Sequence, residues 1–207
     1  IYVCANPDIT APDASNSSLE NEKRILMANP GSNQNQQTFL RFVNPNNTEA
    51  SVEVYGIDDG GKSSRLPQIT FTMAALSAKQ ITAQDLENGN EAKGLTSSLC
   101  DGEGKWQLII RSDLAIDVMG LIRTPDGFLT SLNDIVPKSG NDNIIYFANP
   151  ASNSNQQTFL RIVNISSSSG SVTITGVDDN GNASAGSVTF SLGSYEAKQM
   201  TAQDLEN

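Results

Sequence analysis

An internal repeat constrains the fold of this chain more than any other feature of its sequence. Residues 28–44 and 148–164 are identical at 14 of 17 positions, and residues 78–88 match 197–207 at 10 of 11. The offset between copies changes from 120 to 119 residues, so one residue is deleted between the two matching stretches. A unit of about 120 residues has the size of a folded domain and is too long for a solenoid repeat.

The division of the chain follows from this repeat and from its polar stretches. The sequence PKSGNDN at 137–143 is rich in turn-forming residues and separates the two copies. The second copy stops after AQDLEN, before the half that follows this motif in the first copy. We therefore predict an N-terminal segment at 1–23, a complete unit at 24–138, and the first half of a second unit at 139–207.

Apolar and polar side chains alternate over short stretches, as half-buried strands require. Val52 and Val54, for example, alternate with Glu53. The expected strands of the complete unit are 24–28, 38–44, 51–57, 69–73, 78–82, 105–112, 115–123 and 127–133. The sequence thus predicts an all-β fold, an antiparallel β-sandwich of immunoglobulin-like or jelly-roll-like type with about eight strands per complete unit.

The incomplete second unit raises the question of what covers its apolar face, because a few strands cannot bury one alone. Three answers are open: the chain continues past Asn207, the first unit supplies the cover, or another molecule donates strands. Ile1, Tyr2 and Val3 begin the segment IYVCANP, which resembles IYFANP at 145–150. These three residues are candidates for strand exchange between chains, and a chance match is the alternative.

Charge and hydropathy exclude two classes of partner. The formal net charge is −10, and no basic stripe is present to attract a phosphate backbone, so nucleic acid is not an expected partner. No stretch approaches the roughly 20 apolar residues of a membrane helix. The chain begins at Ile1 without a signal-peptide pattern and reads as a processed or excised segment.

The search for catalytic groups argues against an enzyme and against a cofactor. The chain has no histidine, which excludes Ser-His-Asp, Cys-His and HExxH chemistry. Its adjacent carboxylate pairs lie in predicted turns, at Asp58 and Asp59 and at Asp178 and Asp179. Clustered carboxylates beside glycine could bind calcium. The alternative is structural, because Asp-Gly and Asn-Gly sequences favour tight hairpin turns.

Three further side-chain features have a structural and a functional interpretation. Cys4 and Cys100 could form a disulfide that closes a long loop, or remain two free thiols. Arg41 and Arg161 occupy equivalent strand positions, where each could bind an anionic ligand or pair with Asp85 and Asp204 respectively. Trp106 could stack on a sugar, but its period with Leu108 and Ile110 predicts a core residue.

The motifs of the first unit resemble those of β-sandwich modules repeated in secreted bacterial proteins. They are VNP at 43–45, GIDDGG at 56–61, TAQDLE at 82–87, DGEGKW at 101–106, SDLAIDVM at 112–119 and LIRTPDGFLT at 121–130. The second unit carries the pattern through Glu206 but has Ile165 in place of Pro45. The resemblance implies an extracellular accessory role and no catalytic residues.

These observations lead to one principal functional expectation and two alternatives. We expect a non-enzymatic extracellular repeat protein that acts in adhesion or ligand binding at the cell surface, with a surface glycan or protein as its partner. The first alternative is a structural subunit of an extracellular filament, a homopolymer built by strand exchange. The second is an accessory domain of a secreted hydrolase.

Overall fold

The computed structural model describes residues 21–63, 69–100, 102–127, 129–131 and 144–206, and the chain forms two compact units, Ile1–Val136 (unit 1) and Pro137–Asn207 (unit 2). Antiparallel strands dominate both units, so the predicted all-β class is confirmed. Every helix within the described residues is too short or too polar to cross a membrane.

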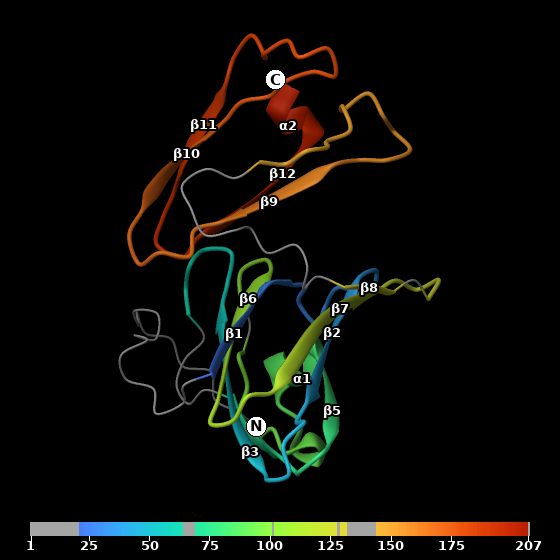
Figure 1. The fold of residues 1–207 in the computed structure, drawn as a ribbon, viewed down its shortest axis with the longest axis vertical. Helices are drawn as coiled ribbons and strands as arrows, with labels where there is room; N and C mark the ends of the chain where they lie inside the picture. The colour runs from blue at the N-terminus through green and yellow to red at the C-terminus, as the bar shows by residue number, and fades with distance from the viewer. Residues whose placement is uncertain (1–20, 64–68, 101, 128, 132–143, 207) are drawn as a thin grey trace. The chain divides into compact units, whose positions relative to one another are not determined.

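Unit 1 contains two open four-stranded antiparallel sheets (Figure 1). The first sheet has the order β1 (Asn21–Ala28), β6 (Trp106–Ser112), β3 (Ala50–Ile57) and β4 (Ile69–Met73). The second has the order β5 (Ala78–Thr82), β2 (Gln37–Val43), β7 (Asp117–Arg123) and β8 (Leu129–Ser131). Helix α1 (Ala83–Asn88) and the short 3-10 helix η2 (Glu91–Lys93) follow β5.

Both sheets of unit 1 contribute side chains to one buried hydrophobic cluster. Phe42 of β2 meets Phe71 of β4 edge to face, with ring centroids 5.2 Å apart. Leu40 and Phe42 are fully buried, and Trp106 is only 3% exposed, which confirms the prediction that this tryptophan is a core residue. The period-two alternation of apolar side chains therefore produces the core that it predicts.

Asparagine side chains tie the loops of unit 1 together. The Asn44 side-chain amide donates to the carbonyl oxygens of Thr48 and Ala74, at 2.9 and 3.0 Å. These bonds connect the loop after β2 to the turn between β4 and β5. In unit 2 the amide of Asn164 donates in the same way to Ser168 and Gly193, at 2.7 and 2.6 Å. Each amide satisfies backbone carbonyls that the sheets leave unpaired.

Unit 2 contains two separate strand pairs in its described residues. Strand β9 (Phe159–Val163) pairs with β12 (Ala197–Thr201), β10 (Gly170–Ile174) pairs with β11 (Val188–Leu192), and helix α2 (Ala202–Glu206) follows β12. Their registers match those of unit 1. Arg161 lies opposite Gln199 as Arg41 lies opposite Gln80, and the β10–β11 register corresponds in the same way to that of β3–β4.

The inner face of unit 2 is less buried than that of unit 1. Leu160 and Ile162 correspond to the fully buried Leu40 and Phe42, yet both are only partly buried. The residues at 144–147 correspond to part of β1, but they form no strand and are exposed. The same local sequence therefore gives the same strand pairs in both units with different degrees of burial.

The contrast in burial predicts different costs for truncating equivalent residues. Phe42→Ala removes a fully buried ring and should lower the free energy of unfolding of unit 1 by about 3–5 kcal/mol. Denaturant unfolding followed by fluorescence reports on unit 1, because Trp106 is the sole tryptophan. The matched control, Ile162→Ala in unit 2, should shift this transition by less than about 0.5 kcal/mol. Equal shifts for the two variants would contradict the assignment of the core.

Candidate functional site

The adjacent aspartates of unit 1 hold two loops together. Asp58 is buried, and its carboxylate accepts hydrogen bonds from the backbone N–H groups of Lys62 at 2.9 Å and Glu103 at 3.1 Å. The Asp59 carboxylate accepts the N–H of Lys105 at 2.9 Å. The turn after β3 is thereby joined to the segment that leads into β6. Both carboxylates have a local structural use, as the turn interpretation expects.

The equivalent turn in unit 2 is exposed and uses its aspartate differently. The Asp178 carboxylate accepts the side-chain amide of Asn182 and the backbone N–H groups of Asn182 and Asn180. These hydrogen bonds, that from the Asn182 side chain first, lower the pKa of Asp178. Asp179 is exposed. The described residues contain no group of three side chains suited to hold a metal ion, so the calcium hypothesis for Asp58, Asp59, Asp178 and Asp179 rests on sequence alone.

Part of the predicted N-terminal chemistry lies outside the described residues. This applies to Ile1, Tyr2 and Val3, proposed for strand exchange, and to Cys4, proposed as the disulfide partner of Cys100. Cys100 itself follows the buried Leu99 and has a positive φ of 64°. The disulfide and the strand exchange therefore remain predictions.

Asp85 is the centre of a polar cluster at the start of α1. Thr82 and Asp85 form a reciprocal capping box, and the Asp85 carboxylate also accepts hydrogen bonds from Asn90 and Lys93. Burial alone would raise the pKa of Asp85, but these hydrogen bonds, led by that from Lys93, outweigh it and lower the pKa from 3.8 to about 2. The basic partner of Asp85 is therefore Lys93. The predicted pairing of Asp85 with Arg41 is wrong.

Trp106 is held in the core of unit 1 by a carboxylate. Its indole Nε1 donates to Glu87 Oε1 at 2.8 Å, and Glu87 Oε2 accepts the backbone N–H of Gly31 at 2.9 Å. Gly56 lies against the ring, since a Cβ at this position would come within 2.8 Å of Trp106 Cε3. Buried indole N–H groups need such a partner. The sequence alone does not reveal this contact, because Glu87 and Trp106 are 19 positions apart in the chain.

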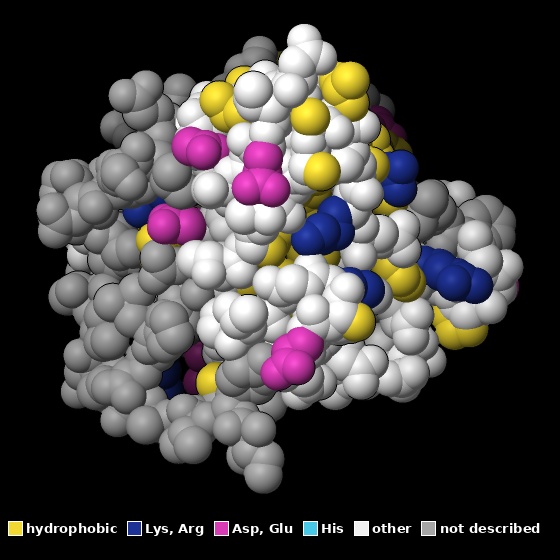
Figure 2. All heavy atoms as spheres, turned by 90° about the horizontal axis from the view of Figure 1, so that it is seen from below, with side chains coloured by type: hydrophobic (Ala, Val, Ile, Leu, Met, Phe, Trp, Pro, Cys, Tyr) yellow, Lys and Arg dark blue, Asp and Glu magenta, His cyan; other side chains and the backbone are white. Residues whose placement is uncertain are grey.

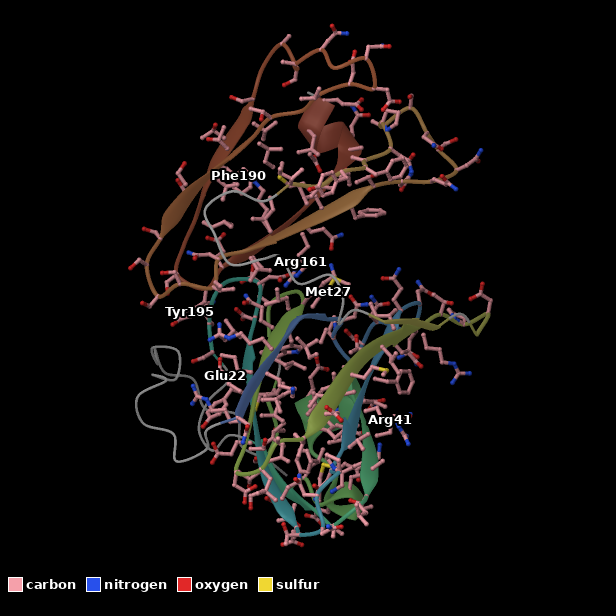
Figure 3. The ribbon with its side chains drawn as sticks, viewed as in Figure 1. Glu22, Met27, Arg41, Arg161, Phe190 and Tyr195 are labelled. Carbon is pink, nitrogen blue, oxygen red and sulfur yellow. The ribbon has the colours of Figure 1, made fainter. Side chains whose placement is uncertain are left out.

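The outward face of β2 and β5 presents a candidate binding surface. Phe39, Arg41 and Val43 alternate with the buried residues of β2, and Arg41 points away from the interior of unit 1 (Figure 3). Gln80 lies directly opposite Arg41, and Met119 of β7 lies on its other side and is 46% exposed. An exposed guanidinium therefore lies between an amide and an apolar side chain on an open sheet face.

All seven outward-facing residues of β2 and β5 are unchanged in the second copy. Gln37, Phe39, Arg41, Val43, Ala78, Gln80 and Thr82 correspond to Gln157, Phe159, Arg161, Val163, Ala197, Gln199 and Thr201. On the opposite side of the same strands Thr38, Leu40 and Lys79 are unchanged, and Phe42 and Ile81 are replaced by Ile162 and Met200. Packing of the core therefore does not account for the identity of the outward face.

The other sheet provides an internal comparison. On β3 and β4, the outward-facing residues Glu53, Tyr55 and Thr72 are replaced in the second copy by Thr173, Thr175 and Ser191. Ser51 and Thr70, two of five such positions, are the same in both copies. The two copies have thus diverged at one surface while remaining identical at the other, and this pattern marks the β2–β5 face for a shared role.

An open hollow of about 700 Å³ lies beside β3, β4 and the η2 segment, and its chemistry is structural. The Lys79 ammonium in its wall donates to the carbonyl oxygens of Thr72 at 3.1 Å and Lys93 at 2.8 Å, and lies 4.8 Å from the centroid of the Phe71 ring. Burial lowers the pKa of Lys79. The two lysines that line the hollow, Lys79 and Lys93, already have partners, so the hollow is not assigned a ligand.

The charges on the visible surface are dispersed. Figure 2 shows acidic and basic side chains interspersed with neutral and apolar ones on one face of the molecule. Such a surface differs from the continuous basic stripe typical of proteins that bind a phosphate backbone.

Comparisons with known proteins identify no family. No protein-family model and no curated protein matches the chain. Among solved structures, it is similar to the Anabaena sensory rhodopsin transducer, with 14% sequence identity and a TM-score of 0.35. The similarity covers 49% of this chain and 95% of that chain. No argument about function rests on a likeness at this level.

The lowered pKa of Asp85 predicts an acid-dependent contribution to stability. Because its folded-state pKa is below its ordinary value, the ionised carboxylate stabilises unit 1 above about pH 4, and this stabilisation is lost as the pH falls towards about 2. Asp85→Asn should therefore lower the free energy of unfolding, measured by Trp106 fluorescence, most at pH 5–6 and least near pH 2. The control is Asp204→Asn, the equivalent change in unit 2, which should leave this transition unchanged at every pH. A loss in Asp85→Asn that is independent of pH would show that the charge of Asp85 is not responsible.

Proposed function

We propose that this chain is a non-enzymatic extracellular repeat protein that acts in adhesion or ligand binding at the cell surface. Its complete unit is a β-sandwich of the immunoglobulin-like or jelly-roll-like kind, and the outward face of β2 and β5 is its contact surface. The observation that carries the proposal is the identity of all seven outward-facing residues of these strands with their counterparts in the second copy.

The sandwich architecture is supported by the packing of the two sheets of unit 1. Phe42 and Phe71 come from different sheets and are in direct contact, and side chains from both sheets belong to one buried cluster. In this architecture the core uses the inner faces, and the outer face of β2 and β5 remains available for a partner.

The chemistry of the shared face suits a partner larger than a small molecule. Phenylalanine and arginine are common at the centres of protein interfaces, and an aromatic ring can also stack on a sugar. Arg41 can donate several hydrogen bonds to a carboxylate or to hydroxyl oxygens, and Gln80 beside it can both donate and accept. The face is an open sheet surface, which fits a surface glycan or a protein better than it fits a buried cofactor.

The occurrence of the same outward-facing residues twice in one chain also favours a partner that presents the same group repeatedly. Glycans and proteins on cell surfaces meet this condition, and the second contact then forms at a high effective concentration. The Asn-, Ser- and Thr-rich composition of the chain agrees with an extracellular setting.

The proposal is tested with variants of the shared face. The full chain is applied to three kinds of array, which carry immobilised neutral glycans, acidic glycans or extracellular-matrix proteins. We expect saturable binding to one of these classes, reduced by about tenfold or more in the double variant Arg41→Gln/Arg161→Gln, because charge-assisted hydrogen bonds are lost. Each single variant should bind with intermediate avidity.

The control variant is Lys62→Gln, which removes one exposed positive charge from the loop after β3 and leaves the shared face intact. It should bind as the unmodified chain does. Binding that survives in the double arginine variant would exclude this face as the contact surface, and blank arrays of all three kinds would count against adhesion.

A further inference from the structure

Two strands of unit 1 have neighbours that their counterparts in unit 2 lack among the described residues. In unit 1, β2 pairs with both β5 and β7, and β3 pairs with both β4 and β6. In unit 2, β9 and β10 each have one neighbour among the described residues, β12 and β11 respectively. The edges that receive β6 and β7 in unit 1 are therefore unpaired by the described residues of unit 2.

The burial of the inner side chains agrees with this difference. Val52 and Val54 of β3 are at most 1% exposed, whereas their counterparts Val172 and Ile174 are only partly buried. The inner apolar side chains of unit 2 could therefore be covered by two further strands that correspond to β6 and β7 of unit 1.

Specific polar groups that hold the start of β6 in unit 1 also recur in unit 2. Asp59 accepts the N–H of Lys105, and Glu87 accepts the indole N–H of Trp106. Their counterparts are Asp179 and Glu206. Glu206 already accepts the backbone N–H of Ala151 through Oε1 at 2.8 Å, which repeats the contact between Glu87 and Gly31.

The glycine against which the indole ring of Trp106 lies also recurs. A Cβ at Gly56 would collide with Trp106, which explains glycine at this position of unit 1. Gly176 is the counterpart of Gly56, and a Cβ there would meet no atom closer than Ser184 Cβ at 4.0 Å. Nothing among the described residues of unit 2 requires a glycine at position 176, whereas a tryptophan ring placed as in unit 1 would require it.

We propose that unit 2 is a receptor for a strand pair with the sequence of Gly102–Arg123, supplied as a further copy of this segment of the chain. Its first strand adds to β10 and its second to β9, both antiparallel, in the registers that β6 and β7 have in unit 1. The tryptophan ring lies against Gly176, and its N–H donates to Glu206. Main-chain pairing supplies affinity, and the place for the tryptophan ring at Gly176 and Glu206 (the indole slot) supplies specificity.

The proposal is independent of the adhesion proposal, since it concerns the open edges and inner face of unit 2, whereas the adhesion proposal concerns the outer face of both units. The test uses a fluorescently labelled synthetic peptide of residues Gly102–Arg123, which contains no cysteine, and the full chain. Fluorescence anisotropy should show saturable binding, and hydrogen exchange should slow in β9 and β10 when the peptide is bound.

The indole slot is tested by a matched pair of glycine variants in the full chain. Gly176→Ala places a methyl group in the slot and should weaken peptide binding by about tenfold or more. Gly186→Ala makes the same chemical change where a Cβ has no neighbour within 4 Å, and should bind the peptide normally. Equal binding by the two variants would overturn the proposal.

The hydrogen bond is tested by a double-mutant cycle between peptide and chain. A peptide with Trp106→Phe should bind the unmodified chain about tenfold more weakly, because the donor to Glu206 is lost. The same peptide change should have little further effect on a Glu206→Ala chain. Additive losses in the cycle, or equal binding of a scrambled peptide, would contradict the assigned contact.

Discussion

The need to cover the inner face of each strand pair governs the whole structure. A pair such as β2–β5 or β9–β12 presents apolar side chains on one side, and such a face is unfavourable in contact with water. In unit 1 the second sheet provides the cover, and Phe42 and Phe71 meet across the interface. In unit 2 the same pairs form in the same registers with less of their inner face covered. Local sequence is therefore sufficient to specify the pairs, whereas burial depends on strands elsewhere.

Several acidic residues of unit 1 act as hydrogen-bond acceptors for its backbone and side chains. Asp58 and Asp59 join two loops, Asp85 caps a helix, and Glu87 holds both an indole and a backbone N–H group. Carboxylates with such partners are positioned by the fold and in turn stabilise it. This use explains how a chain with 23 acidic residues can place several of them in buried or half-buried positions.

The sequence was sufficient to predict the local elements and insufficient for the contacts between distant ones. The expected strands at 69–73 and 78–82 coincide with β4 and β5. The pattern of β6 predicted one buried and one exposed face, but all seven residues of β6 are buried. Arg111, on its outward face, is only 3% exposed, with Glu22 at 3.1 Å and its guanidinium over the Tyr55 ring. The alternation of apolar and polar residues predicts which face of the sheet a side chain is on. Whether that face is buried depends on residues from other parts of the chain.

The neighbours of the candidate binding surface could not be predicted from the sequence either. Arg41 and Arg161 were identified from the sequence as equivalent strand residues, but the neighbours that give Arg41 its chemistry come from β5 and β7. The Asp85 pairing was assigned to the wrong cation because Lys93 reaches that carboxylate only through the fold of the η2 segment. Comparing the two copies position by position along each strand could have revealed the invariant outward face without a structure.

The Lys79 side chain lies at the β4 border of the first sheet of unit 1. Its ammonium contacts the carbonyl of Thr72 on β4, the strand at one end of that sheet, and Lys198 lies over Phe190 of β11 in the corresponding place in unit 2. A cation at the border of a sheet discourages another chain from extending it there. Lateral growth by strand pairing is thereby disfavoured at the β4 and β11 borders of these sheets.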